Sequence, residues 1–345
     1  MNLGKLGQAL TGREIFDLIH DDLVEVERKL SAESVASVET VTAIGQYLHS
    51  AGGKRLRPAL LILSSRLATS EVAGEPSSDS ARSPAAAIHL GAVVELIHAA
   101  TLVHDDVIDA AQTRRGRPSS NVKWGNQTCV LAGDWLYMQA FQIALRERNF
   151  LILDLLIGLT QIMVEGELLQ LEHLGRIDIS EPDCMELVDR KTARLFSVCA
   201  RLGVLAAHGD AALQERLGEY AWNLGMAFQL VDDVLDFTAR EKTLGKPVGG
   251  DLREGKVTLP LVYALERATP AEHRLVRTIL EERSYDTVPF ARILDLLEKY
   301  RGIERVRDRA QAFTDKARMV INEFPESAYQ RALLTVTDLV TDRDH

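Results

Sequence analysis

Two acidic segments inside apolar, helix-periodic stretches constrain the fold of this chain more than any other feature. The first, DDVID at 105–109, follows the nearly uncharged run 85–103. The second, DDVLD at 232–236, has apolar neighbours on nearly every side and lies 127 residues later (232 minus 105). A helix that is apolar all round is buried, and buried carboxylates are costly unless they are paired or bind a metal. The sequence therefore predicts two facing helices whose acids share a cationic partner.

The spacing of these acids indicates the partner. On a helix of about 3.6 residues per turn, residues four apart share one face, as Asp105 and Asp109 do. Carboxylate oxygens are the ligands that Mg²⁺ prefers, so Asp105, Asp109 and Asp232 are predicted to be metal ligands. Arg114 and Arg115 follow the first motif and supply forked donors that suit phosphate oxygens. The pattern predicts a cluster of more than one Mg²⁺ that bridges a diphosphate.

A third acidic segment has nearly the same letters but a different setting. HDDLVE at 20–25 lies in a strongly charged amphipathic helix. Acidic runs of this kind usually form a solvated surface. We therefore interpret this segment as structural and solvated, without a metal.

Charge and cysteine usage exclude several classes of protein. The formal net charge is −10, from 50 acids against 40 bases, so we expect no nucleic-acid partner. The three cysteines are scattered and form no CxxC pair, which favours a reducing, cytoplasmic location. The N-terminus lacks the apolar core of a signal peptide, and no charge-free run reaches the length of a membrane span.

Helix signals dominate along the whole chain, so the fold class predicted is all-α. Apolar residues repeat with helical spacing, and strand signals are scarce. The stretch 69–84 is rich in Ser, Pro, Gly and charge, which predicts a flexible surface loop and not a domain boundary. We expect residues 1–345 to form one domain.

Several motifs together resemble the trans-isoprenyl diphosphate synthases (the polyprenyl synthetase family). They are the two DDxxD motifs, GGKRLRP at 52–58, the Arg114–Arg115 pair and GGDLREGK at 249–256. The resemblance covers about Gln46 to Leu265 and implies a single large helical bundle of the isoprenoid synthase type with a central active-site cavity. It also implies a homodimer that condenses isopentenyl diphosphate with an allylic diphosphate.

The resemblance implies roles for individual residues. Lys54, Arg57, His98 and Arg115 would bind isopentenyl diphosphate. Arg114 would act with magnesium on the allylic diphosphate. The allylic diphosphate and its reacting carbon would be contacted by Lys191, Thr192, Gln229, Lys246 and Lys256. A loop at 241–255 has glycines that suit closure over a ligand.

Product length is predicted from two small residues. Ala100 and Thr101 lie about one turn before the first motif, where short-chain members of the family typically have an aromatic plug. Small residues here predict an open cavity floor and a long-chain product, as in heptaprenyl or octaprenyl diphosphate synthases. Such a lipid would be handed to a membrane. In the alternative, small residues only let two helices pack closely, and the chain is a short-chain farnesyl or geranylgeranyl diphosphate synthase. A terpene cyclase or an inactive regulatory subunit is a further alternative, although both aspartate motifs are intact.

Overall fold

Helices account for nearly all of the regular structure, which confirms the all-α prediction. The computed structural model describes the chain except for residues 1–11, 51–54, 74–83, 239–247 and 342–345. In chain order the elements are α1 (Gly12–Leu18), α2 (His20–Glu33), α3 (Glu39–Ser50), α4 (Leu56–Ala73), α5 (Ala85–Ile108), β1 (Thr113–Arg114), β2 (Arg117–Pro118), α6 (Ser120–Trp124), α7 (Asn126–Arg146), α8 (Phe150–His173), α9 (Glu181–Val188), the π-helical turn η2 (Asp189–Ala193), α10 (Arg194–Ala206), α11 (Ala211–Thr238), α13 (Gly250–Arg253), α14 (Leu259–Leu265), α15 (Pro270–Glu282), α16 (Phe290–Lys299), α17 (Gly302–Asn322) and α18 (Ala328–Thr341).

The first acidic motif ends a helix in the centre of the bundle. Before the acids of the motif, α5 is apolar on nearly all sides, with Glu95 and three histidines as its main polar residues, and it packs against α2, α4, α7 and α10. This is the packing that a helix without a polar face requires. By length and composition α5 could cross a membrane, but 72% of its most apolar window is buried inside the protein. α5 is therefore a core helix.

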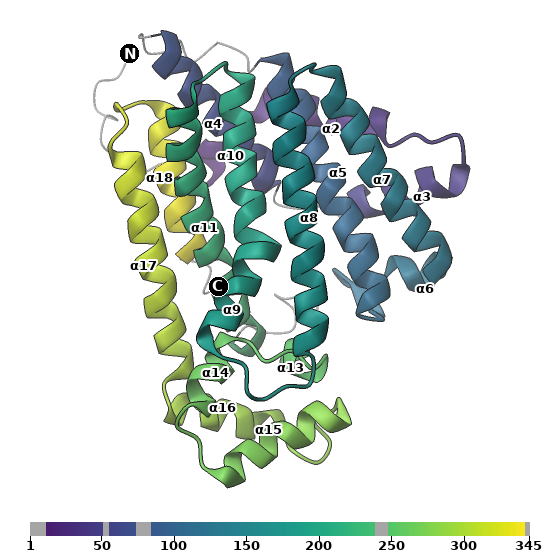
Figure 1. Cartoon of the computed structure of the whole chain (residues 1–345), viewed down its shortest axis with the longest axis vertical. Coiled ribbons are helices and arrows are strands. Elements are labelled where there is room, and N and C mark those ends of the chain that lie inside the picture. Colours follow the sequence, from purple (N-terminus) through teal and green to yellow (C-terminus); the bar gives the residue numbers. More distant parts are fainter. Residues whose placement is uncertain (1–11, 51–54, 74–83, 239–247, 342–345) are drawn as a thin grey trace.

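The second acidic motif ends a neighbouring long helix. α11 packs against α10 and α17, and α8, α10, α11 and α17 run along the long axis of the molecule (Figure 1). The short helices α13 to α16 gather at one end of this bundle. The segment after α13 returns to α5, where Lys256 pairs with Asp109. Both acidic motifs therefore lie at the same end of the bundle.

The predicted surface loop at 69–84 begins later than expected. α4 continues to Ala73, so residues 69–73 are helical. Thr69 and Ser70 are compatible with the helix because their hydroxyl groups donate hydrogen bonds to backbone carbonyls of the preceding turn. Thr69 donates to the Ser65 carbonyl, and Ser70 donates to the Leu67 carbonyl. Residues 74–83 lie outside the described part of the chain.

The interpretation of HDDLVE as a solvated surface was wrong for one of its acids. Asp22 is only 4% exposed, and its Oδ2 accepts hydrogen bonds from Arg66 Nε (3.1 Å) and Nη2 (2.6 Å) on α4. A buried carboxylate is tolerated when a buried guanidinium neutralises it. Asp22 therefore joins α2 to α4 and has no part in a metal site.

Candidate active site

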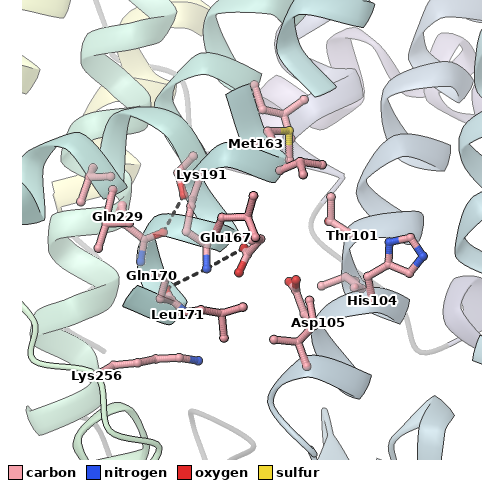
Figure 2. Close-up of a pocket in the computed structure, with 18 of the residues that line it drawn as sticks. Thr101, His104, Asp105, Met163, Glu167, Gln170, Leu171, Lys191, Gln229 and Lys256 are labelled. Carbon is pink, nitrogen blue, oxygen red and sulfur yellow. Dashed lines mark hydrogen bonds and ion pairs between the residues drawn. The ribbon is translucent and has the colours of Figure 1, made fainter. Parts of the chain in front are cut away.

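A cavity of about 690 Å³ lies between α5, α7, α8, η2 and α11 (Figure 2). The predicted site residues that line it are Arg57, His98, Thr101, Asp105, Lys191, Thr192, Gln229, Asp232 and Lys256. Residues from four separate sequence motifs thus meet in one space. The remaining wall is largely apolar.

The first motif divides its acids between the cavity and the core. Asp105 lines the cavity, and Asp109 is the C-cap residue of α5. Asp106 is fully buried and accepts hydrogen bonds from Arg114 Nε (2.6 Å), Ser120 N (3.0 Å) and Ser120 Oγ (2.8 Å). The middle acid of the motif therefore has a structural role, because it ties the following segment to α5.

That segment is a small β-hairpin that carries the predicted arginine pair. β1 and β2 pair antiparallel, with Arg114 opposite Arg117, and the turn residues Arg115 and Gly116 have φ of 51° and 72°. A two-residue turn of this hand needs positive φ at both positions. Arg114 is committed to Asp106, and neither Arg114 nor Arg115 lines the cavity.

The acids of the second motif also differ in their exposure. Asp233 and Asp236 are buried, whereas Asp232 is exposed and faces the cavity. Burial and then the nearby Asp251 raise the pKa of Asp233 well above its usual range. Asp233 Oδ1 accepts a hydrogen bond from Gln229 Nε2 (2.9 Å), and Gln229 Oε1 accepts one from Thr192 Oγ1 (2.8 Å). This chain of hydrogen bonds orients Gln229 and Thr192 toward the cavity.

Two lysines neutralise carboxylates across the cavity. Lys256 Nζ lies 3.0 Å from Asp109 Oδ2 and 2.8 Å from Glu254 Oε2. Burial disfavours the charge of Lys256, but these two carboxylates outweigh burial and raise its pKa. Lys191 Nζ pairs with Glu167 Oε1 (2.7 Å) and donates to Gln170 Oε1 (2.8 Å), as Figure 2 shows. Both lysines are held in place beside the acids of the first motif.

The electrostatic environment of Asp105 favours a cation. Burial, followed by the neighbouring Glu167, raises the pKa of Asp105 to about 7, and Asp109 adds to the effect. Two helical turns before Asp105, burial and then Arg57 and Arg115 lower the pKa of His98 well below its usual range. The negative charge around Asp105 suits a metal ion, and the positive charge around His98 suits a diphosphate.

Lys191 and Thr192 belong to the π-helical turn η2, which two glycines accommodate. A Cβ added at Gly225 on α11 would lie 2.7 Å from Ala193 Cα, and one added at Gly166 on α8 would lie 2.9 Å from Arg190 Cβ. π-turns inside helices are frequent at functional sites. Apart from the Lys-Thr pair itself, no sequence signal predicted this turn.

The carboxylates fit magnesium only in part by themselves. Within the described ranges, no three His, Cys, Asp or Glu side chains converge closely enough to hold a metal ion. The acids at the cavity still supply the oxygen ligands and negative charge that Mg²⁺ prefers. Oxygen atoms from a bound diphosphate would be needed to complete the coordination of an ion between the two motifs.

Of the predicted site residues that the structure describes, Ala100, Asp109, Arg114 and Arg115 do not line the cavity. The prediction was wrong for Ala100, which is fully buried and does not line the cavity, whereas Thr101 does. A helix turns about 100° per residue, so the position five before Asp105 points about 140° away from it, while the position four before shares its face. Lys54 and Lys246 lie outside the described residues, as does most of the predicted closing loop at 241–255.

Several cavity residues were missed or left without a role in the sequence. Glu167 and Gln170 are three apart on α8 and both bind Lys191. Their i, i+3 spacing on an apolar helix is the signal that could have identified them. Asp134 lies within an apolar run of the sequence, which is typical of a structural acid, but it is exposed, lines the cavity and has its Oδ1 3.4 Å from His104 Nε2.

Comparisons with known proteins agree with this geometry. Residues 38–297 match the model of the polyprenyl synthetase family. The chain is 35% identical over 332 residues to an octaprenyl diphosphate synthase of Haemophilus influenzae, covering 96% of this chain and 97% of that one. It is 34% identical over 300 residues to a geranylgeranyl diphosphate synthase of Saccharolobus solfataricus, covering 85% and 86%.

Solved structures support the same conclusion. The fold matches a crystal structure of a polyprenyl synthase from Caulobacter crescentus, complexed with calcium and isoprenyl diphosphate, with a TM-score of 0.88 and 33% identity. The match covers 98% of this chain and 99% of that one. As its motifs predicted, the chain belongs to the polyprenyl synthetase family, and it is a prenyltransferase.

Proposed function

We propose that this chain condenses isopentenyl diphosphate with an allylic diphosphate to give a long-chain all-trans polyprenyl diphosphate. The observation that carries the proposal is the cavity itself. Asp105, Lys191 and Lys256 surround a charged region of it, and the wall continues past Thr101 and Met163 as an apolar surface (Figure 2). A substrate with a diphosphate at one end and a growing hydrocarbon at the other fits this division.

Asp105, Asp109 and Asp232 would hold the magnesium ions. When bound, these ions supply Lewis-acid and electrostatic stabilisation of the departing diphosphate. Support comes from the raised pKa of Asp105, which reflects burial and then the neighbouring negative charge of Glu167, and from the calcium in the related crystal structure. Lys191 and Lys256 are placed to exchange their carboxylate partners for diphosphate oxygens.

The remaining residues divide between the two substrates. Arg57, His98 and Arg115 would hold the diphosphate of isopentenyl diphosphate, so that its double bond faces the allylic carbon. As the allylic carbon–oxygen bond breaks, the double bond forms the new carbon–carbon bond, and a proton then leaves the product. Thr192 and Gln229 would present a hydroxyl oxygen and an amide oxygen to the positive charge that develops on the allylic carbon. Their hydrogen bonds to each other and to Asp233 hold both side chains in place.

A long product is supported by the small side chain of Thr101 on the cavity wall. Overall identity does not decide the matter, because relatives at 35% and 34% identity include a long-chain and a geranylgeranyl synthase. The first experiment is therefore incubation of the purified chain with isopentenyl diphosphate, farnesyl diphosphate and Mg²⁺, with mass spectrometry of the products. We expect products longer than geranylgeranyl diphosphate and no turnover after EDTA. Products that stop at geranylgeranyl diphosphate would contradict the long-chain proposal, and lack of turnover would contradict the proposed function.

A homodimer is supported by an apolar outer face on α7 and α8. The exposed side chains on this face include Leu131, Met138, Leu145, Phe150, Ile157, Val164 and Leu168. Exposed apolar side chains gathered on two neighbouring helices are typical of protein interfaces. Val164 and Leu168 also line the cavity, so a second copy packed on this face would complete the cavity wall. We propose that the partner is a second copy of this chain in a two-fold arrangement.

This proposal predicts the effect of one charge placed on the face. Met138→Glu should shift the protein toward monomers, because a buried unpaired carboxylate is costly. Met319→Glu on α17 is the matched control, since Met319 is 63% exposed and Met138 is 62% exposed. Light scattering after size-exclusion chromatography measures the molar mass. A wild-type monomer, or the same mass for both variants, would contradict the dimer.

A cytoplasmic location is supported by the cysteines. Cys129, Cys184 and Cys199 are all buried and free. Free thiols of this kind suit a reducing compartment. The product, a polyprenyl lipid with a charged head, would leave for a membrane.

A further inference from the structure

Arg55 occupies an unusual position directly before α4. Its φ is 46°, in the left-handed region that few residues other than glycine adopt. α4 begins at the next residue, Leu56. Some interaction must hold the backbone in this conformation, because the conformation is costly by itself.

Two carboxylates from different helices supply that interaction. Arg55 Nη1 donates to Oε2 of Glu95 on α5 at 2.7 Å, and Arg55 Nη2 donates to Oε2 of Glu27 on α2 at 3.1 Å. Arg55 Nε makes a second, short contact with Glu27 Oε1. The side chains of Arg55 and Glu95 are 19% and 7% exposed. The guanidinium therefore joins the start of α4 to both α2 and α5.

None of these three residues lines the cavity, but Arg55 and Glu95 are each close in sequence to a residue that does. Arg57 follows Arg55 by two residues and lines the cavity. Glu95 lies one helical turn before His98, which also lines it. The contacts of Arg55 thus fix the position of one cavity residue relative to the other.

Arg57 needs such external support. Within the described chain it makes no hydrogen bond or ion pair, its buried Nε has no partner, and the Phe196 ring lies 6.0 Å from its Cζ. Side-chain rotamers start from the backbone, so a shift of the backbone moves the guanidinium of Arg57, and few polar contacts of its own oppose that shift. That backbone is the turn that Arg55 holds.

We propose that Arg55, clamped between Glu27 and Glu95, is a positioning residue that aims Arg57 at the diphosphate of the homoallylic substrate. The inference rests on the proposed function, because it assigns Arg57 to isopentenyl diphosphate. Glu27 and Glu95 act through Arg55 and do not touch the substrate. α2 therefore contributes to the site, although its sequence indicated only a scaffold.

Geometry and charge can be separated by Arg55→Lys. Lysine keeps the positive charge but has no planar fork, so it cannot reproduce two directed contacts with carboxylates on opposite sides. The matched control is Arg66→Lys. Arg66 also joins α4 to α2, through Asp22, but it lies three turns further along α4 and does not line the cavity.

Steady-state kinetics with each substrate varied in turn is the test. We expect Arg55→Lys to raise the KM for isopentenyl diphosphate about tenfold, as loss of a charged hydrogen bond would. The KM for farnesyl diphosphate and kcat at saturation should stay within about twofold. Arg66→Lys should reduce thermal stability without separating the two KM values. Direct calorimetry of isopentenyl diphosphate binding should show the same tenfold change in Kd.

The outcomes distinguish this inference from the proposed function. If the wild type consumes isopentenyl diphosphate but Arg55→Lys leaves its KM unchanged, or changes both KM values equally, only the inference is overturned. If the wild type neither binds nor consumes isopentenyl diphosphate, the proposed function itself is overturned. If Arg55→Lys does not fold, Glu27→Gln removes one arm of the clamp, and we expect a smaller rise, about threefold, in the same KM. An unchanged KM in that variant would also overturn the inference.

Discussion

Asp105→Asn is expected to lower kcat about a thousandfold, the effect of removing one preorganised electrostatic group from an active site. The asparagine has nearly the same shape and keeps one oxygen ligand, but it removes a negative charge that lies near those of Glu167 and Asp109. The fold should survive, because loss of that charge relieves repulsion with the neighbouring acids. Product formation with isopentenyl and farnesyl diphosphates measures kcat, and thermal denaturation measures the stability.

The look-alike acidic segment provides the matched control for this substitution. Asp21 lies in HDDLVE, is exposed and is remote from the cavity. Asp21→Asn should leave kcat within about twofold, since exposed surface substitutions have small effects. Higher Mg²⁺ should restore part of the activity of Asp105→Asn if the carboxylate binds metal. Near-normal turnover of Asp105→Asn would remove Asp105 from the proposed metal site.

The contrast between these two segments shows what the sequence could predict. The apolar flanks of DDVID and DDVLD were enough to predict two acidic helices at one cavity, because burial of charge demands a partner. The same reasoning failed for Asp22, whose partner Arg66 is 44 residues away in the chain and leaves no local signal. Long-range pairing of this kind cannot be read from periodicity alone.

Which acids of a motif have a structural role also depends on tertiary structure. Spacing placed Asp105 and Asp109 on one face, but it could not show that Asp106 would be fully buried against Arg114 and Ser120. Arg114 was therefore predicted as a free phosphate ligand, whereas its Nε is engaged by Asp106 in this structure. A substrate that competes for Arg114 must do so against a buried carboxylate.

The second large effect that we expect is a change of product length on substitution of Thr101, because of the helical face on which it lies. Thr101→Phe is expected to shorten the product to geranylgeranyl or farnesyl diphosphate, because an aromatic ring on the cavity wall would occupy the space that the growing chain needs. Thr101 shares a face with Asp105, lines the cavity and donates its hydroxyl to the His98 carbonyl at 2.8 Å. Mass spectrometry of the products with farnesyl and geranyl diphosphates as primers measures the change.

Thr101→Val is the control, because it keeps the volume and removes only the hydroxyl. Its product should match that of the wild type, which assigns the effect of phenylalanine to size. The turnover of isopentenyl diphosphate with geranyl diphosphate should persist in Thr101→Phe, since the charged region around Asp105 and Lys256 is unchanged. A product distribution unaffected by phenylalanine would mean that the chain grows along another wall. The cavity continues to the exposed side chains Val164 and Leu168, so that wall would be the one that a second copy of the chain covers.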